Sequence, residues 1–437
     1  MSDTRFKVSP GGQLTGRLRV PGDKSISHRS IMLGSLADGV TEVSGFLEGA
    51  DSLATLQAFR AMGVAISGPD NGNVTIQGVG LRGLQAPAQV LDLGNSGTSM
   101  RLMSGLLAGQ SFDVALTGDA SLSTRPMQRV VEPLSRMGAH ITTTAAGTAP
   151  LVIRGGALLH GIDYAMPMAS AQVKSCLLLA GLYADGTTCV MESAPTRDHT
   201  ERMLSGMGYP LHRESGRVCL VGGHRLTAIA IDVPADISSA AFFLVGASIA
   251  PGSDLVLEHV GMNPTRTGVI EILQQMGAAI DISNRREIGG EPVADLHIRS
   301  AELHGIEIDP ALVPLAIDEF PAVFVAAACA RGRTVLTGAE ELRVKESDRI
   351  QVMADGLQQL GIDATPTHDG MIIVGGSLTA GRVDSHGDHR IAMAFAMAAL
   401  RSQGEIEILD CENVNTSFPG FADLAAQTGL SIVSGGP

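Results

Sequence analysis

The sequence gathers basic and hydroxyl residues in one short stretch, DKSISHR at 23–29, which an apolar run follows directly. Lys24 and Arg29 are fixed cations, and Ser25 places a hydroxyl beside them. The first turn of a helix also offers unpaired N–H groups and partial positive charge, which attract anions. The stretch therefore predicts a helix start that binds a phosphate or a carboxylate, with His28 in a structural hydrogen bond.

Further groups of the same chemistry follow along the chain. They are Gly97, Thr98 and Arg101 in LGNSGTSMR, Arg125 in STRPM, Ser170, Gln172 and Lys174 in ASAQVK, Arg197 in TRDH, Lys345 and Arg349 in EELRVKESDR, and Arg390 in GDHR. A guanidinium matches phosphate and carboxylate oxygens with paired hydrogen bonds, and lysine adds a point charge. This set of cations fits two small polyanions better than one.

Acidic residues accompany these cations in two places. Asp318 and Glu319 begin an apolar run, where a carboxylate commonly caps a helix. Lys345 and Arg349 are four residues apart, so in a helix they share one face, and Glu346 comes three residues before Arg349. The spacing predicts a helical face on which Glu346 pairs with Arg349.

A pattern of two helices recurs six times along the chain. The first helix is amphipathic and ends at a glycine; its copies lie at 56–66, 131–141, 200–211, 270–280, 353–364 and 421–432. Its glycines, expected to form left-handed caps, are Gly63, Gly138, Gly208, Gly277, Gly361 and Gly429. The second helix is apolar nearly all round, which predicts burial; its copies lie at 23–39, 95–109, 169–181, 235–252, 318–332 and 388–404.

Both helix types repeat about every 70 residues, and alternating apolar and polar runs between them predict strands. A chain of 437 residues is too long for one core. The pattern therefore predicts an α/β protein with three β/α units in each of two domains and a boundary near 230–236. If the two domains face each other, the starts of their buried helices point into one cleft and form a positive funnel.

The composition excludes several classes of protein. The formal net charge of −14 argues against nucleic acid and anionic membranes as general partners. No apolar run reaches the ~18 residues of a membrane span. The N-terminus lacks the apolar region of a signal peptide, so we expect a cytoplasmic protein.

Neither disulfides nor a metal site is expected. No CxxC pair occurs, so we expect reduced thiols at Cys176, Cys189, Cys219, Cys329 and Cys411. HGDHR places His386, Asp388 and His389 together, but no further His or Cys lies at ligand spacing. The sequence therefore predicts no metal.

Eight motifs, in order over nearly the whole chain, together resemble one family. They are PGDKSISHR, LGNSGTSMRL, STRPM, ASAQVKS, TRDHTERM, DEFP, EELRVKESDR and GDHRIAMA. The set is similar to the 5-enolpyruvylshikimate-3-phosphate synthases, also called 3-phosphoshikimate 1-carboxyvinyltransferases. SAQVKS and TRDHT resemble the class II branch of that family in particular.

The resemblance implies the fold in more detail. Members of the family have two domains of three βαβαββ units each, with the active site in the cleft between them. The chain of the family crosses between the domains twice. The expected domains here are 21–234, and 1–20 together with 235–437.

The resemblance also implies the reaction. The family transfers the enolpyruvyl group of phosphoenolpyruvate to the 5-hydroxyl of shikimate 3-phosphate and releases phosphate, by addition and then elimination through a tetrahedral intermediate. The product leads to chorismate and the aromatic amino acids. Both substrates carry a phosphate and a carboxylate, which fits the set of cations. No cofactor or metal, no nucleic acid and no membrane is implied, and we expect a monomer.

Site residues are carried over motif by motif. The shikimate 3-phosphate contacts implied are Lys24, Ser25, Arg29, Ser170, Ala171, Gln172, Arg197, Asp318 and Lys345. The phosphoenolpyruvate contacts implied are Lys24, Gly97, Arg125, Gln172, Arg349 and Arg390. Asp318 is the expected base at the 5-hydroxyl, and Glu346 and Lys24 are expected to handle protons at the enolpyruvyl carbon.

The chain departs from the family pattern at several positions. NVNTSFPGF has Thr416 and Ser417 where many relatives carry a lysine, so one cation on the phosphoenolpyruvate side is missing. Arg197 replaces a tyrosine of many class I members. Gly97 leaves room where some tolerant class II members carry a bulkier residue, so we expect sensitivity to glyphosate.

Two other functions remain as alternatives. UDP-N-acetylglucosamine 1-carboxyvinyltransferase shares the fold and the donor, but usually has a cysteine five residues before an Arg-Pro pair. Here Arg125-Pro126 places Ala120 at that position. The second alternative is a non-catalytic anion-binding relative, against which the presence of Asp318 and Glu346 argues.

Overall fold

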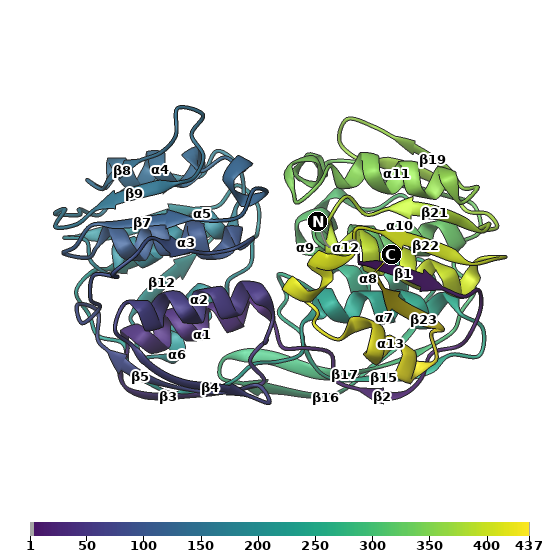
Figure 1. The fold of residues 1–437 in the computed structure, drawn as a ribbon, viewed down its shortest axis with the longest axis horizontal. Helices are drawn as coiled ribbons and strands as arrows, with labels where there is room; N and C mark the ends of the chain where they lie inside the picture. The colour runs from purple at the N-terminus through teal and green to yellow at the C-terminus, as the bar shows by residue number, and fades with distance from the viewer. Residues whose placement is uncertain (1–3, 437) are drawn as a thin grey trace. The chain divides into compact units, whose positions relative to one another are not determined.

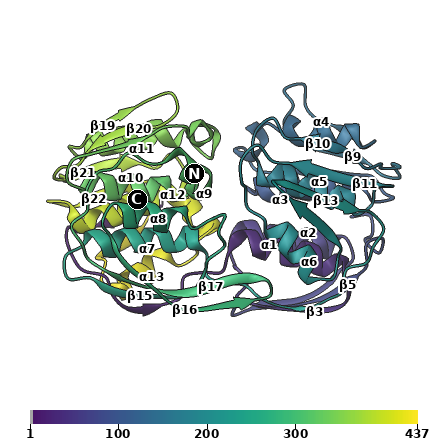
Figure 2. The same ribbon diagram turned by 180° about the vertical axis from the view of Figure 1, so that it is seen from behind.

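The computed structural model describes residues 4–436, which form two compact units (Figure 1; Figure 2 gives the reverse view). Unit 2 consists of Gly22–Val233 and Ile288–Glu291. Unit 1 consists of the residues up to Pro21, Pro234–Glu287 and the residues from Pro292 onward. Each unit has its own hydrophobic core, because the buried apolar residues form two separate clusters, one within each unit.

The units depart from the predicted domain bounds at Pro21 and Pro234, which belong to unit 1, and at one short segment. Residues 288–291, a hairpin turn within the second predicted domain, belong to unit 2. Arg202 Nη1 donates to the Gly290 carbonyl at 2.9 Å, and His199 Nδ1 lies 2.8 Å from Glu291 Oε1. These partners are far apart in the sequence, so no local pattern indicates that they meet.

Unit 2 contains three four-stranded sheets of one design. In each sheet the first two strands are parallel and the remaining neighbours are antiparallel. The strand orders are β14 (Ala230–Asp232), β3 (Asp38–Ser44), β5 (Asn73–Val79), β4 (Ala65–Asp70); β6 (Leu91–Asp92), β7 (Val114–Thr117), β9 (Leu151–Arg154), β8 (His140–Thr142); and β10 (Asp163–Ala165), β11 (Thr187–Met191), β13 (Arg217–Val221), β12 (Leu211–Glu214).

Six helices alternate with these strands. They are the buried helices α1 (Lys24–Leu36), α3 (Gly97–Ala108) and α5 (Ala171–Gly181), and the amphipathic helices α2 (Ala50–Ala61), α4 (Gln128–Arg136) and α6 (His199–Gly206). Every residue of α3 except Thr98 is buried, as its apolar sequence predicts. In Figure 1, α1 and α3 lie between the sheet of β3–β5 and the sheet of β7–β9.

Unit 1 repeats this design with strands from both ends of the chain. The strand orders are β2 (Thr15–Leu18), β15 (Asp254–Gly261), β17 (Glu291–Arg299), β16 (Ala279–Ile288); β18 (Arg333–Leu336), β20 (Met371–Val374), β19 (Asp363–Pro366); and β21 (Gly381–Asp384), β22 (Ile406–Leu409), β1 (Arg5–Val8), β23 (Ile432–Gly435). In the three-stranded sheet, a parallel bridge between Glu307 and Val335 stands where the other sheets have their first strand. The purple strand β1 lies among yellow strands in Figure 1 because its partners are β22 and β23.

The helices of unit 1 follow the same two types. They are the buried helices α7 (Ile237–Ile249), α10 (Phe320–Cys329) and α12 (His389–Ala398), the amphipathic helices α8 (Gly268–Gln275), α11 (Arg349–Gln359) and α13 (Phe421–Thr428), and the short α9 (Val313–Ala316). Single 3-10 turns occur at η1 (Leu122–Thr124), η2 (Pro310–Leu312), η3 (Glu340–Val344), η4 (Ala399–Arg401) and η5 (Glu412–Thr416).

The sixfold helix repeat predicted from the sequence is confirmed. Each predicted buried stretch contains one buried helix, and each predicted amphipathic stretch overlaps one of α2, α4, α6, α8, α11 and α13. All six glycines expected to end the amphipathic helices have positive φ angles, between 81° and 119°. Side chains other than glycine rarely adopt such angles, which explains why glycine recurs there.

Close helix packing in unit 2 depends on one further glycine. A Cβ atom added at Gly105 of α3 would lie 2.0 Å from the backbone oxygen of Cys176 in α5. Any side chain at this position would therefore push the two buried helices apart. Within residues 4–436, no helix is both long and apolar enough to cross a membrane.

The expectation of five reduced cysteines is wrong for two of them. Cys189 and Cys219 are directly opposite each other on the antiparallel strands β11 and β13 and form a disulfide. Cys176, Cys329 and Cys411 are free thiols. The pair is separated by 30 residues and belongs to no short motif, so only the strand register brings it together.

Candidate active site

The starts of the three buried helices of unit 2 lie together. Asp23, Ser96 and Ser170 cap α1, α3 and α5, because each side chain accepts a hydrogen bond from a backbone N–H in the first turn. The remaining first-turn N–H groups and the positive ends of three helices therefore point to one region of unit 2. Side-chain contacts between these first turns, such as that of Gln172 with Thr98, bring the three starts together within unit 2.

Arg101 and Gln172 link the starts of α3 and α5. Arg101 Nη1 donates to Gln172 Oε1 at 2.7 Å, and Gln172 Nε2 donates to the Thr98 hydroxyl at 3.1 Å. Arg125, in the loop after β7, donates from Nη2 to Asn95 Oδ1 at 2.7 Å. The loop that carries Arg125 is thereby tied to the start of α3.

Arg29 is almost wholly buried on α1 and is bound by neutral groups. Its Nε donates to the Thr200 hydroxyl at 2.7 Å, its Nη1 to the Ser25 carbonyl at 2.9 Å, and its Nη2 to the Ser175 hydroxyl at 2.8 Å. Burial lowers the pKa of Arg29 to about 10, so the guanidinium remains charged at neutral pH. The contacts tie α1 to α5 and α6.

Lys24, at the first position of α1, forms an ion pair with Asp51 in the first turn of α2. Asp51 is nearly buried, and the Lys24 side chain is 21% exposed. Asp51 was not among the residues predicted from the sequence, although an aspartate at a helix start beside an apolar run was a usable signal. Ala171 is the first residue of α5, and Arg197 lies half-buried in the loop before α6.

His28 makes the structural hydrogen bond predicted for it. Its ring is fully buried, and Nδ1 lies 2.8 Å from the Thr55 hydroxyl and 3.3 Å from the Ser99 hydroxyl. Burial, together with the charges of Lys24 and Arg29, lowers the pKa of His28 well below 6.5. The imidazole is therefore neutral in the folded protein at pH 7.

We expect the buried neutral His28 to make the protein less stable in mild acid. Below pH 6.5 the unfolded chain binds a proton at this residue and the folded chain does not, so stability falls by up to about 1.4 kcal/mol per pH unit. Thermal unfolding of the wild type and of His28→Gln at pH 7.5 and 5.5 measures this. The wild type should lose more stability over that interval than the variant.

His140→Gln is the matched control, because His140 is exposed on β8 of the same unit. This variant should keep the acid sensitivity of the wild type. An equal loss of stability in the wild type and in His28→Gln would contradict the prediction.

In unit 1 the starts of α10 and α12 meet at Asp318. Asp318 Oδ1 lies 3.4 Å from Lys345 Nζ and 3.3 Å from Arg349 Nη1. Arg390, in the first turn of α12, donates from Nη1 to the Asp318 carbonyl oxygen at 3.1 Å. Four of the residues predicted from the sequence are thus brought together, and the Asp318 side chain remains 14% exposed.

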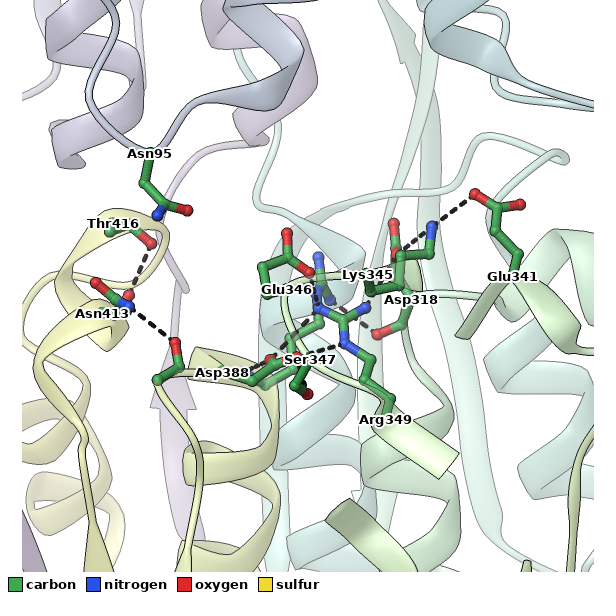
Figure 3. Close-up of polar contacts among 12 residues, drawn as sticks. Asn95, Asp318, Glu341, Lys345, Glu346, Ser347, Arg349, Asp388, Asn413 and Thr416 are labelled. Carbon is green, nitrogen blue, oxygen red and sulfur yellow. Dashed lines mark hydrogen bonds and ion pairs between the residues drawn. The ribbon is translucent and has the colours of Figure 1, made fainter. Parts of the chain in front are cut away.

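Arg349 lies at the centre of this group, as Figure 3 shows, and binds three carboxylates. Its Nη2 donates to Glu346 Oε2 at 2.6 Å and its Nε to Asp388 Oδ2 at 2.8 Å, in addition to the contact with Asp318. Burial alone lowers the pKa of Arg349, but Asp388, Glu346 and Asp318 outweigh it and raise the pKa above its ordinary value. The guanidinium is therefore a permanent charge at this position.

The predicted helical face through Lys345 and Arg349 is wrong. Lys345 and Glu346 lie in the turn between η3 and α11, and α11 begins only at Arg349. The cause is Asp348, whose side chain accepts a hydrogen bond from the Gln351 N–H at 3.0 Å and caps the helix. The predicted pairing of Glu346 with Arg349 forms all the same.

Lys345 forms ion pairs with two carboxylates, those of Asp318 and Glu341 (Figure 3). Its Nζ lies 2.9 Å from Glu341 Oε1 in addition to its contact with Asp318. Asp388, which the sequence analysis considered only as a metal ligand, is fully buried against Arg349 and also accepts from the Ser347 hydroxyl at 3.1 Å. The position of Asp388 just before an apolar helix was the signal for this role.

Glu319 does not cap α10 through its side chain. The carboxylate is 2% exposed, accepts a hydrogen bond from the Ser238 hydroxyl at the start of α7, and lies 3.9 Å from Arg266 Nη2. Arg266 also donates to Asp236 Oδ1 at 2.8 Å. This buried cluster joins the starts of α7 and α10 and so fixes the backbone that carries Asp318.

The structure places the predicted residues in two groups. Those in unit 2 are Lys24, Ser25, Arg29, Gly97, Arg125, Ser170, Ala171, Gln172 and Arg197, at helix starts or in the loops beside them. Those in unit 1 are Asp318, Lys345, Glu346, Arg349 and Arg390. Each group combines fixed cations with a helix start, which is a chemistry suited to phosphate and carboxylate ligands.

Comparison with known proteins identifies the family. The family model described as EPSP synthase (3-phosphoshikimate 1-carboxyvinyltransferase) matches residues 8–424. Proteins named 3-phosphoshikimate 1-carboxyvinyltransferase from Alkalilimnicola ehrlichii and Methylococcus capsulatus are each 70% identical over 98% of this chain, and the matches cover 97% and 98% of those proteins. A solved structure of EPSP synthase from Acinetobacter baumannii is 60% identical, with a TM-score of 0.91, and the match covers 99% of this chain and 100% of that one. The chain therefore belongs to the EPSP synthase family, the 3-phosphoshikimate 1-carboxyvinyltransferases.

Proposed function

We propose that this protein transfers the enolpyruvyl group of phosphoenolpyruvate to the 5-hydroxyl of shikimate 3-phosphate and releases phosphate. The observation that carries the proposal is the position of Asp318, a partly exposed carboxylate between Lys345 and Arg349. A partly exposed carboxylate beside two cations can accept a proton from a hydroxyl group. The relatives named for this reaction support the same conclusion.

Binding of both substrates is assigned to the cations of the two groups. We assign shikimate 3-phosphate to Lys24, Ser25, Arg29, Ser170, Ala171, Gln172, Arg197, Asp318 and Lys345, and phosphoenolpyruvate to Lys24, Gly97, Arg125, Gln172, Arg349 and Arg390. The contacts among these side chains hold several of them in place before a ligand arrives, as Arg101 holds Gln172. Such preorganisation lowers the entropy cost of bringing two anionic substrates into reacting geometry.

The reaction then needs two proton transfers to form a tetrahedral adduct and one more to break it down. Asp318 accepts the proton of the 5-hydroxyl, whose oxygen forms a bond to C2 of phosphoenolpyruvate while the methylene carbon C3 takes up a proton. In the second stage the new methyl group loses a proton, the bond from C2 to the phosphate oxygen breaks, and phosphate leaves. Glu346 and Lys24 together are proposed to handle the protons at C3, and the surrounding cations stabilise the leaving phosphate.

Phosphate release tests this function against its alternatives. The protein is mixed with phosphoenolpyruvate and either shikimate 3-phosphate or UDP-N-acetylglucosamine, and inorganic phosphate is measured. Release with shikimate 3-phosphate alone supports the proposal. Release with UDP-N-acetylglucosamine would support the related transferase, and no release with either acceptor would support a non-catalytic anion-binding relative.

Gly97 makes sensitivity to glyphosate a testable property. A Cβ atom at this position would lie 2.9 Å from Arg101 Nη1 and 3.3 Å from Arg125 Nη1, so both guanidinium groups would have to move. We expect the wild type to be inhibited by glyphosate in competition with phosphoenolpyruvate, and Gly97→Ala to raise the inhibition constant by about tenfold or more. Steady-state inhibition at several phosphoenolpyruvate concentrations measures this.

Gly206→Ala is the matched control, because its added methyl group in α6 meets no atom nearer than 3.7 Å. It should leave inhibition unchanged. Full activity of the wild type in excess glyphosate at limiting phosphoenolpyruvate would contradict the expectation.

We further propose that the protein acts in the cytoplasm as a monomer, using its own side chains and no cofactor for the chemistry. Light scattering coupled to size-exclusion chromatography tests the oligomeric state. A single species with the mass of one chain, 45.2 kDa, is the expected result. A mass of two chains would reject the monomer.

A further inference from the structure

Lys174 is a buried cation that the proposed reaction does not use. It lies in the first turn of α5, and its side chain is 1% exposed. Its ammonium nitrogen lies 2.8 Å from Glu192 Oε1 and 2.7 Å from Glu201 Oε1. Both carboxylates are themselves largely withdrawn from solvent, with exposed fractions of 13% and 3%.

The two glutamates stand at the two ends of one loop. Glu192 directly follows β11, and Glu201 lies in the first turn of α6. The loop between them carries Arg197. Inside the loop, the Thr196 hydroxyl also donates to Glu192. A single ammonium group therefore fastens the beginning and the end of the loop to the buried helix α5.

The same loop end is coupled to Arg29. Arg29 and Lys174 approach α6 at neighbouring residues, because Arg29 Nε donates to the Thr200 hydroxyl. Burial lowers the pKa of Arg29, Glu201 opposes this change, and the positive charge of Arg197 adds to it. Arg197 and Arg29 are thus close enough to interact electrostatically, although like charges repel. Because like charges repel, further contacts are needed to hold the loop that carries Arg197 against Arg29.

Lys174 has the properties of such a restraint. A buried ammonium with two carboxylate partners is costly to break, because removing one member leaves a buried charge without compensation. The interaction is also geometrically specific, since both carboxylates must reach the same nitrogen. The loop cannot swing outward without giving up at least one of the two ion pairs.

We propose that Lys174 is a positioning residue, which holds the loop from Glu192 to Glu201 closed and thereby keeps Arg197 in place to bind shikimate 3-phosphate. The inference rests on the proposed function in one respect, the assignment of Arg197 to that substrate. Lys174 itself touches neither substrate in this scheme. Its effect is therefore expected on the affinity for one substrate and not on the chemical steps.

Hydrogen exchange tests the restraint without reference to activity. In Lys174→Met the backbone amides of residues 193, 194 and 196–198 should exchange about tenfold faster than in the wild type, while those of α3 keep their protection. Unchanged exchange in the loop would overturn the proposal. Uniformly faster exchange across unit 2 would also overturn it, because it would show a general loss of stability.

Steady-state kinetics test the consequence for binding. Lys174→Met should raise the KM for shikimate 3-phosphate about tenfold, with kcat and the KM for phosphoenolpyruvate within about threefold of the wild type. Combined with Arg197→Ala, it should add nothing to the effect of Arg197→Ala alone, because both changes remove the same contact. Additive effects, or an equal rise of both KM values, would overturn the proposal.

The outcomes separate this proposal from the assignment of Arg197. If Arg197→Ala raises the KM for shikimate 3-phosphate and Lys174→Met does not, Lys174 has no positioning role. If Arg197→Ala leaves that KM unchanged, the assignment of Arg197 fails, whatever the loop exchange shows.

Two further variants keep the test decisive. If Lys174→Met does not fold, Glu192→Gln removes only the anchor at the loop start and keeps the pair between Lys174 and Glu201. It should show the same pattern, with the KM for shikimate 3-phosphate raised about fivefold. Arg60→Met is the control, because Arg60 is a cation of the same unit that binds the carbonyls of Ile66 and Gly68 instead. It should change neither loop exchange nor the KM for shikimate 3-phosphate.

Discussion

Asp318→Ala is expected to lower kcat by about two to four orders of magnitude, the usual contribution of a positioned general base. The KM values for both substrates should change far less. Lys345 and Arg349 remain in the variant to bind anionic groups, whereas the oxygen proposed to accept the 5-hydroxyl proton is lost. Steady-state kinetics at saturating concentrations of both substrates measures the effect.

Three variants show whether the loss comes from proton transfer. Asp318→Asn keeps the shape but not the basicity, so it should lose nearly as much turnover as the alanine variant. Glu346→Gln should also lower kcat far more than substrate affinity, in keeping with its proposed role. Glu341→Gln removes the other carboxylate on Lys345 and should stay within about threefold of the wild type. Near-normal turnover in Asp318→Asn would exclude Asp318 as the base.

Arg349→Met is expected to destabilise unit 1 by about 3–5 kcal/mol, because it leaves buried carboxylates without their common partner. Asp388 is fully buried and Asp318 and Glu346 are partly buried, so none of the three is well placed to recover its interactions from water. The most strongly protected amides of α11 and α12 should lose that amount of protection in native-state hydrogen exchange. This readout is local, so it does not require the whole chain to unfold in one step.

Arg331→Met is the matched control for this effect. Arg331 pairs with Glu302 at 2.9 Å in the same unit, but both side chains are more than three-quarters exposed. Exposed pairs contribute about 0–1 kcal/mol, so the control should leave the protection of α11 and α12 intact. A similarly small effect of Arg349→Met would contradict the prediction, because it would show that the three carboxylates around Arg349 are stable without its guanidinium group.

The repetitive part of the fold was predictable from the sequence, because each repeat carries its signals locally. The glycines that end the amphipathic helices and the nearly continuous apolar runs of the buried helices depend on residues within one turn of each other. What remained hidden depends on partners far apart in the chain. The disulfide between Cys189 and Cys219 needs the register of β11 against β13, and residues 288–291 join unit 2 through His199 and Arg202.

The site shows the same division. The cations at the helix starts were found because residue type alone identifies a candidate for anion binding. Their partners Asp51, Asp388 and Glu201 were not, because a carboxylate at a helix start indicates a favourable place for a negative charge but does not show which buried cation it neutralises. Likewise, the prediction of a helix through Lys345 is wrong because Asp348 caps α11, which begins only at Arg349.

The pairing of strand β1 limits the order in which the parts of the protein can fold during synthesis. Phe6 pairs with Ile408 and with Ser434, so the first strand to leave the ribosome has partners that are synthesised about 400 residues later. At about 5–20 residues per second, β1 waits on the order of 20–80 seconds, while the continuous part of unit 2 is already complete. The pairing of β1 with β22 and β23 is thus among the last steps of folding. A chain that lacks β23 would leave this sheet without one edge strand and the helix that carries Arg390 without a finished support.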